Sequence, residues 1–302
     1  MKTNAWISTA AIVAAIGFYS SIPAGAAVIF SQDFSSSPEG PVSTYVNSSS
    51  PDSGQWNAIS TSGAGTTVGV TGGALTYTRG VANVGSFSRT TDFNPTPDAL
   101  IYSFVLTVSG NSVAQTTAAT WQVGSGFGTA NAAEANASVH SRFAVNFTTT
   151  DGTFQFRDIG GGANSGNFSG SQSVTWIINN SGSAMSYVAP DSSIQTIADD
   201  AWDLWAGSVQ VFDEIGATTT GQSLTDLKFA FVAGSGIIAM DNFSIQAVPE
   251  PTTIALGIFA AAFLAASGAR AWLNARRARL GGTANLAVLG GNLPPSRAHH
   301  GS

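Results

Sequence analysis

Carboxylates are the side chains of this sequence that could perform hydrolytic chemistry, because the chain contains no Cys. Glycoside hydrolysis needs two carboxylates about 5 to 10 Å apart, one of which is kept protonated. Residues 27–247 contain only the Glu residues Glu39, Glu134 and Glu214, and none lies in a strand pattern that would aim two acids to one side. We therefore predict no catalytic residues and expect that the chain is not an enzyme.

His140 is the only His within residues 27–247. One imidazole cannot build a zinc site without further nitrogen or thiolate ligands, and a serine triad would need a nucleophile beside it. The sequence has no G-x-S-x-G nucleophile elbow, no Walker loop and no G-x-G-x-x-G motif after a strand. We therefore expect His140 on a loop or at the surface, without a catalytic role.

Asp residues could instead hold a calcium ion, which takes about six to eight oxygen ligands. Asp199, Asp200 and Asp203 form one candidate cluster. Asp33 and Asp241 form a second candidate if the first and last strands of the fold pair. The alternative is that these acids keep a Ser- and Thr-rich exported domain soluble. Calcium is the one cofactor that this pattern suggests.

Aromatic rings that stack on the faces of pyranose sugars are a common means of sugar binding in sandwich folds. Trp56, Trp121 and Tyr187 lie in or beside turn-rich segments, so we assign them as candidate ligand-stacking residues. Trp176 and Trp202 fit a position in the core equally well.

Strand patterns dominate the segment 28–247, which must position all of these residues. The clearest is a strict alternation that places Phe143, Val145 and Phe147 on one face. Such patterning with a polar opposite face is typical of antiparallel sheets that have one side in a core. Further faces are formed by Leu100, Tyr102, Phe104, Leu106 and Val108, by Phe154 and Phe156, by Val174, Trp176 and Ile178, by Val209 and Val211, by Leu227, Phe229 and Phe231, and by Phe243 and Ile245.

Turn residues separate these runs, and Asp151-Gly152 between two alternating runs is the best candidate for a hairpin turn. About eleven to thirteen strands would fit this segment, which favours a single all-β, antiparallel two-sheet β-sandwich of the jelly-roll or concanavalin-like type. A short helical turn at 194–205 is the only helical candidate in this segment.

Residues 1–26 have the features of a secretory signal peptide. Lys2 supplies a positive start, residues 5–18 are largely apolar, and Ala24-Gly25-Ala26 matches an A-x-A processing site. We place the cleavage after Ala26, and expect an N-terminal signal helix and an exported chain.

The segment after residue 247 has the features of a membrane anchor. Its uncharged run at 254–269, extended to residue 273, gives a helix of about 30 Å, which is long enough to cross a membrane. We expect a single transmembrane helix at about 253–273. A Pro-Glu-Pro motif precedes it, and a basic cluster at 270–279 overlaps its end and should stay in the cytoplasm. The residues are Val248, Pro249, Glu250 and Pro251 in the motif, and Arg270, Arg276, Arg277 and Arg279 in the cluster.

This order of motif, apolar helix and Arg cluster resembles the PEP-CTERM sorting signal of bacterial envelope proteins, and the resemblance covers 248–280. It implies a membrane-held precursor that an exosortase, a transpeptidase-like membrane protease, cuts near the motif. The product would be released or attached at the cell surface. Members of that family usually stop soon after the Arg cluster, whereas here residues 281–302 continue as a Gly-, Ala-, Leu- and Pro-rich tail that we expect to be disordered in the cytoplasm. The alternative is an anchor that is never removed.

A second, weaker resemblance concerns the later part of the segment 27–247. Its pattern of strands and turns looks like the later half of concanavalin-like or laminin-G-like jelly rolls, which commonly pair their first and last strands. The segments that carry this resemblance are 174–182, Tyr187, 190–192 and 203–205, supported by 31–34 and 241–245.

Residues 27–247 carry five basic and sixteen acidic residues, a net charge of −11, which should repel phosphate backbones and anionic lipid surfaces. We expect no nucleic-acid partner. The sequence predicts a membrane-anchored precursor that becomes a cell-surface or extracellular-matrix protein, with exosortase and the secretion machinery as partners. Its expected role is non-enzymatic: carbohydrate binding, adhesion or structure, with extracellular polysaccharide as partner. A surface glycoside hydrolase of jelly-roll type is one alternative, and an ice-binding protein is a further one, because the sorting signal also occurs on proteins labelled ice-binding.

Overall fold

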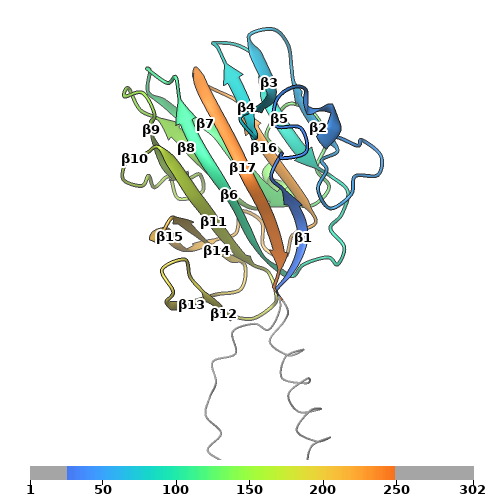
Figure 1. Cartoon of the computed structure of the whole chain (residues 1–302). Helices are drawn as coiled ribbons and strands as arrows, with labels where there is room; N and C mark the ends of the chain where they lie inside the picture. Colours follow the sequence, from blue (N-terminus) through green and yellow to red (C-terminus); the bar gives the residue numbers. More distant parts are fainter. Residues whose placement is uncertain (1–25, 249–302) are drawn as a thin grey trace, which may run out of the picture. The chain divides into compact units, whose positions relative to one another are not determined.

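Two large antiparallel sheets lie face to face in the computed structural model, which describes residues 26–248 (Figure 1). This is the all-β sandwich that the alternating patterns predict. The predicted signal helix, transmembrane helix, basic cluster and tail lie outside the described residues. Within residues 26–248, no helix is both long enough and apolar enough to cross a membrane.

The first sheet has eight strands, in the order β15-β14-β11-β6-β17-β4-β3, and β1 also pairs with β17. One half of β17 pairs with β4 and the other half with β1, so the first and last strands are paired, which is the condition set for a site at Asp33 and Asp241. The strands of this sheet are β1 (Ala27–Gln32), β3 (Thr66–Thr71), β4 (Ala74–Arg79), β6 (Ala99–Ser109), β11 (Ser171–Asn179), β14 (Ala201–Ala206), β15 (Val209–Gly216) and β17 (Gly236–Ala247).

The second sheet has seven strands, in the order β10-β9-β8-β7-β16-β5-β2. The predicted turn at Asp151-Gly152 joins β8 to β9, which form an antiparallel pair. The strands of this sheet are β2 (Ala58–Thr61), β5 (Gly85–Arg89), β7 (Gln115–Gly124), β8 (Val139–Phe147), β9 (Thr153–Asp158), β10 (Phe168–Ser169) and β16 (Asp226–Phe231).

A small hairpin of β12 (Met185–Val188) and β13 (Ile194–Ile197) completes the strands of the described residues. The predicted helical turn at 194–205 is therefore wrong, because this segment forms β13 and β14. The hairpin packs on the eight-stranded sheet, where Tyr187 and Ile197 share a small apolar cluster with Trp205. Strand pairing and burial in this cluster outweigh the weak local preference for a helix. Two short 3-10 helices, η1 (Val42–Tyr45) and η2 (Asn136–Ser138), lie in connections.

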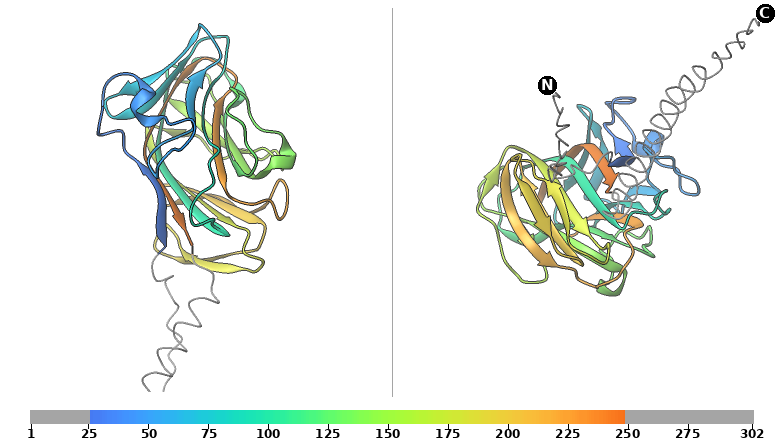
Figure 2. Two further views of the ribbon diagram at one scale, coloured as in Figure 1. Left: turned by 90° about the vertical axis from the view of Figure 1, so that its right-hand side faces the viewer. Right: turned by 90° about the horizontal axis from the view of Figure 1, so that it is seen from below.

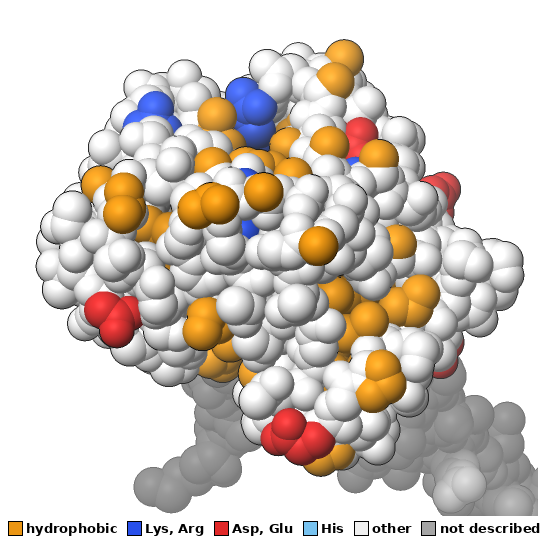
Figure 3. Space-filling view, turned by 90° about the horizontal axis from the view of Figure 1, so that it is seen from above, with side chains coloured by type: hydrophobic (Ala, Val, Ile, Leu, Met, Phe, Trp, Pro, Cys, Tyr) orange, Lys and Arg blue, Asp and Glu red, His pale blue; other side chains and the backbone are white. Residues whose placement is uncertain are grey.

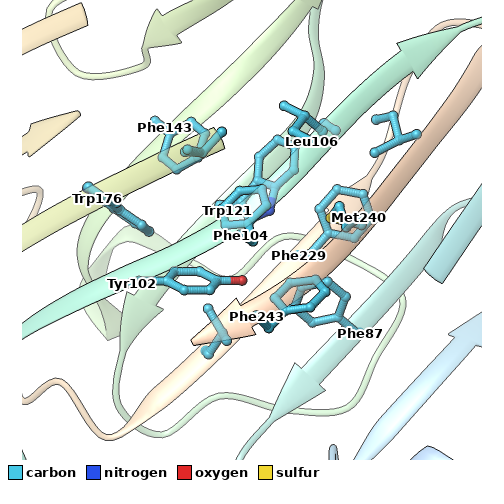
Figure 4. Packing of buried hydrophobic residues seen from close by; sticks show 14 of the residues in the cluster. Phe87, Tyr102, Phe104, Leu106, Trp121, Phe143, Trp176, Phe229, Met240 and Phe243 are labelled. Atoms are coloured by element: carbon cyan, nitrogen blue, oxygen red, sulfur yellow. The ribbon is translucent and has the colours of Figure 1, made fainter. Parts of the chain in front are cut away.

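The core between the two large sheets is built mainly from aromatic rings (Figure 4). Trp121 stacks on Phe143 with ring centroids 5.0 Å apart, and also contacts Phe229 at 4.9 Å. On the facing side of the core, Phe243 of β17 stacks on Phe104 of the neighbouring strand β6, with ring centroids 5.6 Å apart. Such pairs contribute about 0.5 to 1.5 kcal/mol each beyond the burial of their area. The inner face of the seven-stranded sheet packs on this aromatic layer, and its outer face carries polar side chains.

Candidate functional site

The outer face of the seven-stranded sheet carries a row of hydrogen-bonding side chains that crosses four strands. Gln122 on β7 lies opposite Lys228 on β16 and, on its other side, opposite Arg142 on β8. Lys228 in turn lies opposite Ser88 on β5. Because neighbouring strands are about 4.8 Å apart, the row is roughly 14 Å long. Ser88, Lys228 and Gln122 are buried, whereas Arg142 at the end of the row is partly exposed.

A second row lies two residues further along the same strands. From β5 to β9 it consists of the register partners Ser86, Ala230, Thr120, Ala144 and Arg157. The two rows together make this face of the sheet polar and cationic at its β8–β9 side.

Segment 125–138, which connects β7 to β8, crosses this outer face and is held there by side chains of the sheet. Lys228 Nζ donates to the carbonyl oxygen of Gly128 at 2.9 Å and forms an ion pair with the Glu134 carboxylate. Gln122 accepts a 2.8 Å hydrogen bond from the Glu134 amide. Figure 2 shows this green part of the chain, including η2, on the outer side of the sandwich.

Two further anchors hold the same segment. The Oδ1 atom of Asn131 accepts hydrogen bonds from Ser60 Oγ at 3.1 Å and Ser86 Oγ at 2.8 Å. The amide of Phe127 donates to Asp226 Oδ2 at 2.7 Å. Segment 125–138 is therefore attached to strands β2, β5, β7 and β16.

Asp226 and Glu134 are two acids of this face that contact neighbouring residues of segment 125–138. They accept hydrogen bonds from consecutive amides, those of Phe127 and Gly128. Burial raises the pKa of Asp226 to about 6, although hydrogen bonds from Phe127 and Thr225 favour its ionised form. Asp226 is thus shifted toward its protonated state, while Glu134 is paired with Lys228. Both carboxylates, however, are bonded to segment 125–138.

The sequence reasoning missed Asp226 and Lys228 as members of this site. Their spacing contains the signal, because residues two apart on a strand point to the same side and Phe229 between strands β5 and β7 faces the core. Lys228 and Asp226 must then lie on the opposite, outer face. What the spacing cannot give is the partner Glu134, which comes from a connection almost a hundred residues earlier.

Three polar atoms on this face are buried without a hydrogen-bond partner among the described residues. They are Ser88 Oγ, Thr120 Oγ1 and Arg142 Nε. Buried polar atoms normally have a partner, and the other such atoms of the described residues belong to Trp and Tyr side chains of the core. Because all three atoms are buried, none of them is open to a ligand in this arrangement.

His140 lies on β8 and is fully buried, so the prediction of a loop or surface position is wrong. Its Nδ1 atom is 2.8 Å from Ser141 Oγ, and its Nε2 atom is 3.2 Å from Asp200 Oδ1. These residue types match a serine triad, but Ser141 is also fully buried and cannot reach a substrate. Burial lowers the pKa of His140, with a smaller opposing effect from Asp200. The arrangement is structural.

The predicted calcium cluster of Asp199, Asp200 and Asp203 is not formed, because the three carboxylates have different partners. Asp199 and Asp200 each accept a 2.8 Å hydrogen bond from a different glycine amide. Asp203 is fully buried, and accepts bonds from the Tyr187 hydroxyl at 2.5 Å and the Glu214 amide at 2.7 Å. Within residues 26–248, no group of three or more His, Cys, Asp or Glu side chains is placed to hold a metal ion.

The second calcium candidate lies where β1 meets the irregular part of β17. An open cavity of about 330 Å³ is present there, and it is lined by Ser31, Gln32, Asp33, Asn242 and Phe243. Burial raises the pKa of the neighbouring Asp241, and the negative charge of Asp33 adds to this rise. The two carboxylates are therefore close enough to interact, but they are only two acidic ligands beside an open cavity.

The predicted ligand-stacking residues Trp56, Trp121 and Tyr187 are buried, with exposed fractions of 0%, 0% and 2%. Their proposed role in stacking on sugars is therefore wrong. Every Trp and Tyr within residues 26–248 is buried. Turn-rich neighbours suggested exposure, but the inward positions of the strands place these large rings in the core. Recognition of a sugar by this part of the chain must use hydrogen bonds and charge.

Two of the predicted processing sites lie at the ends of the described residues. Val248 is buried, and its amide donates to the carbonyl oxygen of Ala99 at 2.9 Å. Ala26 is partly exposed beside the start of β1. The other processing and anchor residues, namely Ala24, Pro249, Glu250, Pro251, Arg270, Arg276, Arg277 and Arg279, lie outside the described residues.

Neither a protein-family model nor a curated protein matches this chain. Solved structures with a similar fold include an endo-1,3-beta-glucanase from Streptomyces sioyaensis, which is 13% identical, with 74% of this chain and 97% of that chain covered and a TM-score of 0.42. The carbohydrate recognition domain of Emp46p in its potassium-bound form is 10% identical, with 64% and 89% covered and a TM-score of 0.39. A protein of unknown function with a galectin-like fold from Bacillus subtilis is 9% identical, with 63% and 89% covered and a TM-score of 0.38. Likeness at this level concerns the general sandwich fold and carries no conclusion about activity.

Proposed function

We propose that this chain is an exported cell-surface or matrix protein whose sandwich binds a polysaccharide on the outer face of the seven-stranded sheet, without cleaving it. The observation that carries the proposal is the β8–β9 part of this face, where Arg142, Gln155 and Arg157 are partly exposed and lie on the same side of the sheet. A sugar chain presents hydroxyl groups along its length, and these long polar side chains can bind several of them at once. Ser88, Lys228 and Gln122, which continue the row, are buried and support this part of the sheet from within.

The non-enzymatic part of this proposal rests on how the acids are used. Glycoside hydrolysis requires a carboxyl group that reaches the glycosidic oxygen and a second that reaches the anomeric carbon. Glu134 is paired with Lys228, and Asp226 holds the amide of Phe127. Both carboxylates are thus engaged in fixing segment 125–138, and the other Glu residues, Glu39 and Glu214, come from elsewhere in the chain.

A glycoside hydrolase is the second candidate function, and one observation favours it. Asp226 has a pKa raised to about 6, as a general acid requires, and Glu134 is held by the next amide along the chain. This function would need segment 125–138 to move away from the sheet. Release of reducing sugar ends from a bound polysaccharide, abolished by both Asp226→Asn and Glu134→Gln, would replace the binding proposal with this one.

The route to the surface is the other part of the proposal. We propose that the signal peptide exports the chain and that the PEP-CTERM-like segment 248–280 holds a membrane precursor for an exosortase. The resemblance in motif order supports this, together with the closed sandwich that ends at Val248 directly before the Pro-Glu-Pro motif.

Binding of the full-length chain, purified in a neutral detergent, to an array of neutral and charged glycans tests the binding function. We expect specific signals that fall at least tenfold in a double variant of the proposed face, Arg142→Ala with Gln155→Ala. The matched control is Ser103→Ala with Thr175→Ala, which are register partners on the other sheet. No signal on any glycan, or equal losses in both double variants, would refute the proposed binding face.

A further inference from the structure

Arg142 and Arg157 lie on the same outer face of the neighbouring strands β8 and β9. Arg157 is the register partner of Ala144, so Arg142 is its diagonal neighbour, two residues further along β8. Diagonal neighbours of this kind are about 7 to 8 Å apart, within reach of long side chains. The two guanidinium groups can therefore act on one ligand.

Neither guanidinium is neutralised by a carboxylate. Within residues 26–248 the ion pairs are Lys228 with Glu134 and, when His140 is protonated, His140 with Asp200. Arg142 donates to Asn136 Oδ1 at 2.7 Å, and Arg157 donates to neutral oxygens of residues 162 and 164. Two adjacent cations therefore remain without a paired carboxylate, although residues 27–247 contain five basic and sixteen acidic residues.

The nearest acid does not cancel this charge. Burial lowers the pKa of Arg142, and the negative charge of Asp158 opposes this with a smaller effect. The Asp158 carboxylate is therefore close enough to Arg142 to interact with it. Its two oxygens, however, accept hydrogen bonds of 2.9 and 2.8 Å from the amides of Gly160 and Gly161. Figure 3 shows that Lys and Arg side chains are few on the face that it presents.

Amide side chains surround the two arginines. Asn146 donates to Asn164 Oδ1 at 2.9 Å, which also accepts a bond from Arg157. Gln155, on the same face of β9 as Arg157, donates to Asn167 Oδ1 at 2.9 Å. Amides of this kind can exchange their mutual hydrogen bonds for bonds to sugar hydroxyls. The surroundings therefore suit a ligand that carries both hydroxyl and anionic groups.

We propose that Arg142 and Arg157 bind the anionic groups, carboxylate or sulfate, of an acidic polysaccharide. This inference rests on the proposed function and names the class of ligand. A planar guanidinium can form two parallel hydrogen bonds with such a group, and both side chains are partly exposed. The acidic remainder of the body repels a polyanion, so binding is confined to this part of the sheet.

The test uses the full-length chain in a neutral detergent and three polymers: polygalacturonate, dextran sulfate and neutral dextran. Affinity is measured by biolayer interferometry at low and at physiological salt. We expect at least one acidic polymer to bind tenfold or more tightly than dextran, with an affinity that falls as salt rises. The preferred acidic polymer distinguishes a carboxylate ligand from a sulfate ligand.

Arg142→Gln with Arg157→Gln should reduce this binding at least tenfold, whereas Arg142→Lys with Arg157→Lys should retain part of it. The matched control is Thr196→Glu with Ser208→Glu, two exposed positions away from the seven-stranded sheet that lower the net charge by the same amount. Equal binding by the Gln double variant, or an equal loss in the control, overturns the proposal. Glycan-array signals on neutral sugars alone would overturn it while leaving the proposed function intact, and no signal on any polysaccharide would overturn both.

Discussion

Lys228 is fully buried on the outer face of the seven-stranded sheet and is neutralised by Glu134, which reaches it from segment 125–138. The Glu134 side chain is 18% exposed, so the pair is mostly shielded from water. This relationship connects stability to the candidate site, because the same ion pair that compensates a buried charge also keeps segment 125–138 on the sheet.

Glu134→Gln should destabilise the protein strongly, because it leaves the Lys228 ammonium buried without a counter-charge. Breaking a buried pair in this way costs about 3 to 5 kcal/mol. Removal of both charges in Lys228→Met with Glu134→Gln should cost less than Glu134→Gln alone. Urea unfolding of the three proteins measures this order. A Glu134→Gln protein as stable as the parent would show that the ion pair does not hold the segment.

Asp226 should make the parent protein lose stability as the pH rises from about 4 to 6. Burial raises its pKa to about 6 in the folded state, against 3.8 for an unperturbed Asp. In this window the folded state binds more protons than the unfolded state, so unfolding becomes easier as the pH increases. Asp226→Asn removes this contribution, so the stability of the variant relative to the parent should increase over the same range. Unfolding free energies at several pH values test this, and a constant difference would contradict it.

Tyr187→Phe should destabilise the protein by about 2 kcal/mol or more, because it leaves a buried carboxylate and a buried indole without their partner. The hydroxyl donates to Asp203 at 2.5 Å and accepts from Trp205 Nε1 at 3.0 Å. Tyr102→Phe is the matched control, since the Tyr102 hydroxyl is buried and has no hydrogen-bond partner. Thermal unfolding should show a clear loss for Tyr187→Phe and little change for Tyr102→Phe. Similar losses in both would indicate that the hydrogen bonds of Tyr187 contribute little.

Replacement of Pro249, Glu250 and Pro251 by Ala should block processing if the C-terminal segment is an exosortase signal. The uncut precursor should then accumulate in the membrane fraction, while the parent protein reaches the surface without its anchor. Mass spectrometry of surface material distinguishes the two, since peptides beyond Leu280 belong only to the precursor. Such peptides in the parent's surface material would support a retained anchor instead.

The sandwich itself was predictable, because several of its strands alternate between apolar and polar residues. Phe143, Val145 and Phe147 face the core as expected, and β8 joins β9 through Asp151-Gly152. Segment 194–205 was not predictable in this way. Its strands are set by the β12–β13 hairpin and by β14 within the large sheet, and these contacts are absent from the local pattern.

The candidate site was largely not predictable. Trp56 and Trp121 were assigned to a ligand because turn residues are close to them in sequence, but both are core residues. His140 was expected on a loop or at the surface, but it is buried, and its Nε2 atom contacts the carboxylate of Asp200, sixty residues further along the chain. Spacing along a strand tells which residues share a face, but it does not tell what covers that face.

The sequence alone therefore determined the class of fold and the acidic character of residues 27–247, since alternation and charge are properties of the residues themselves. The tertiary structure decided which polar side chains come together on one face. Only when β5, β16, β7 and β8 lie side by side do Ser88, Lys228, Gln122 and Arg142 form one row, and only then is Glu134 brought to Lys228. The physical reason is that strand order and long-range ion pairs depend on contacts between residues far apart in the chain, whose packing no local pattern records.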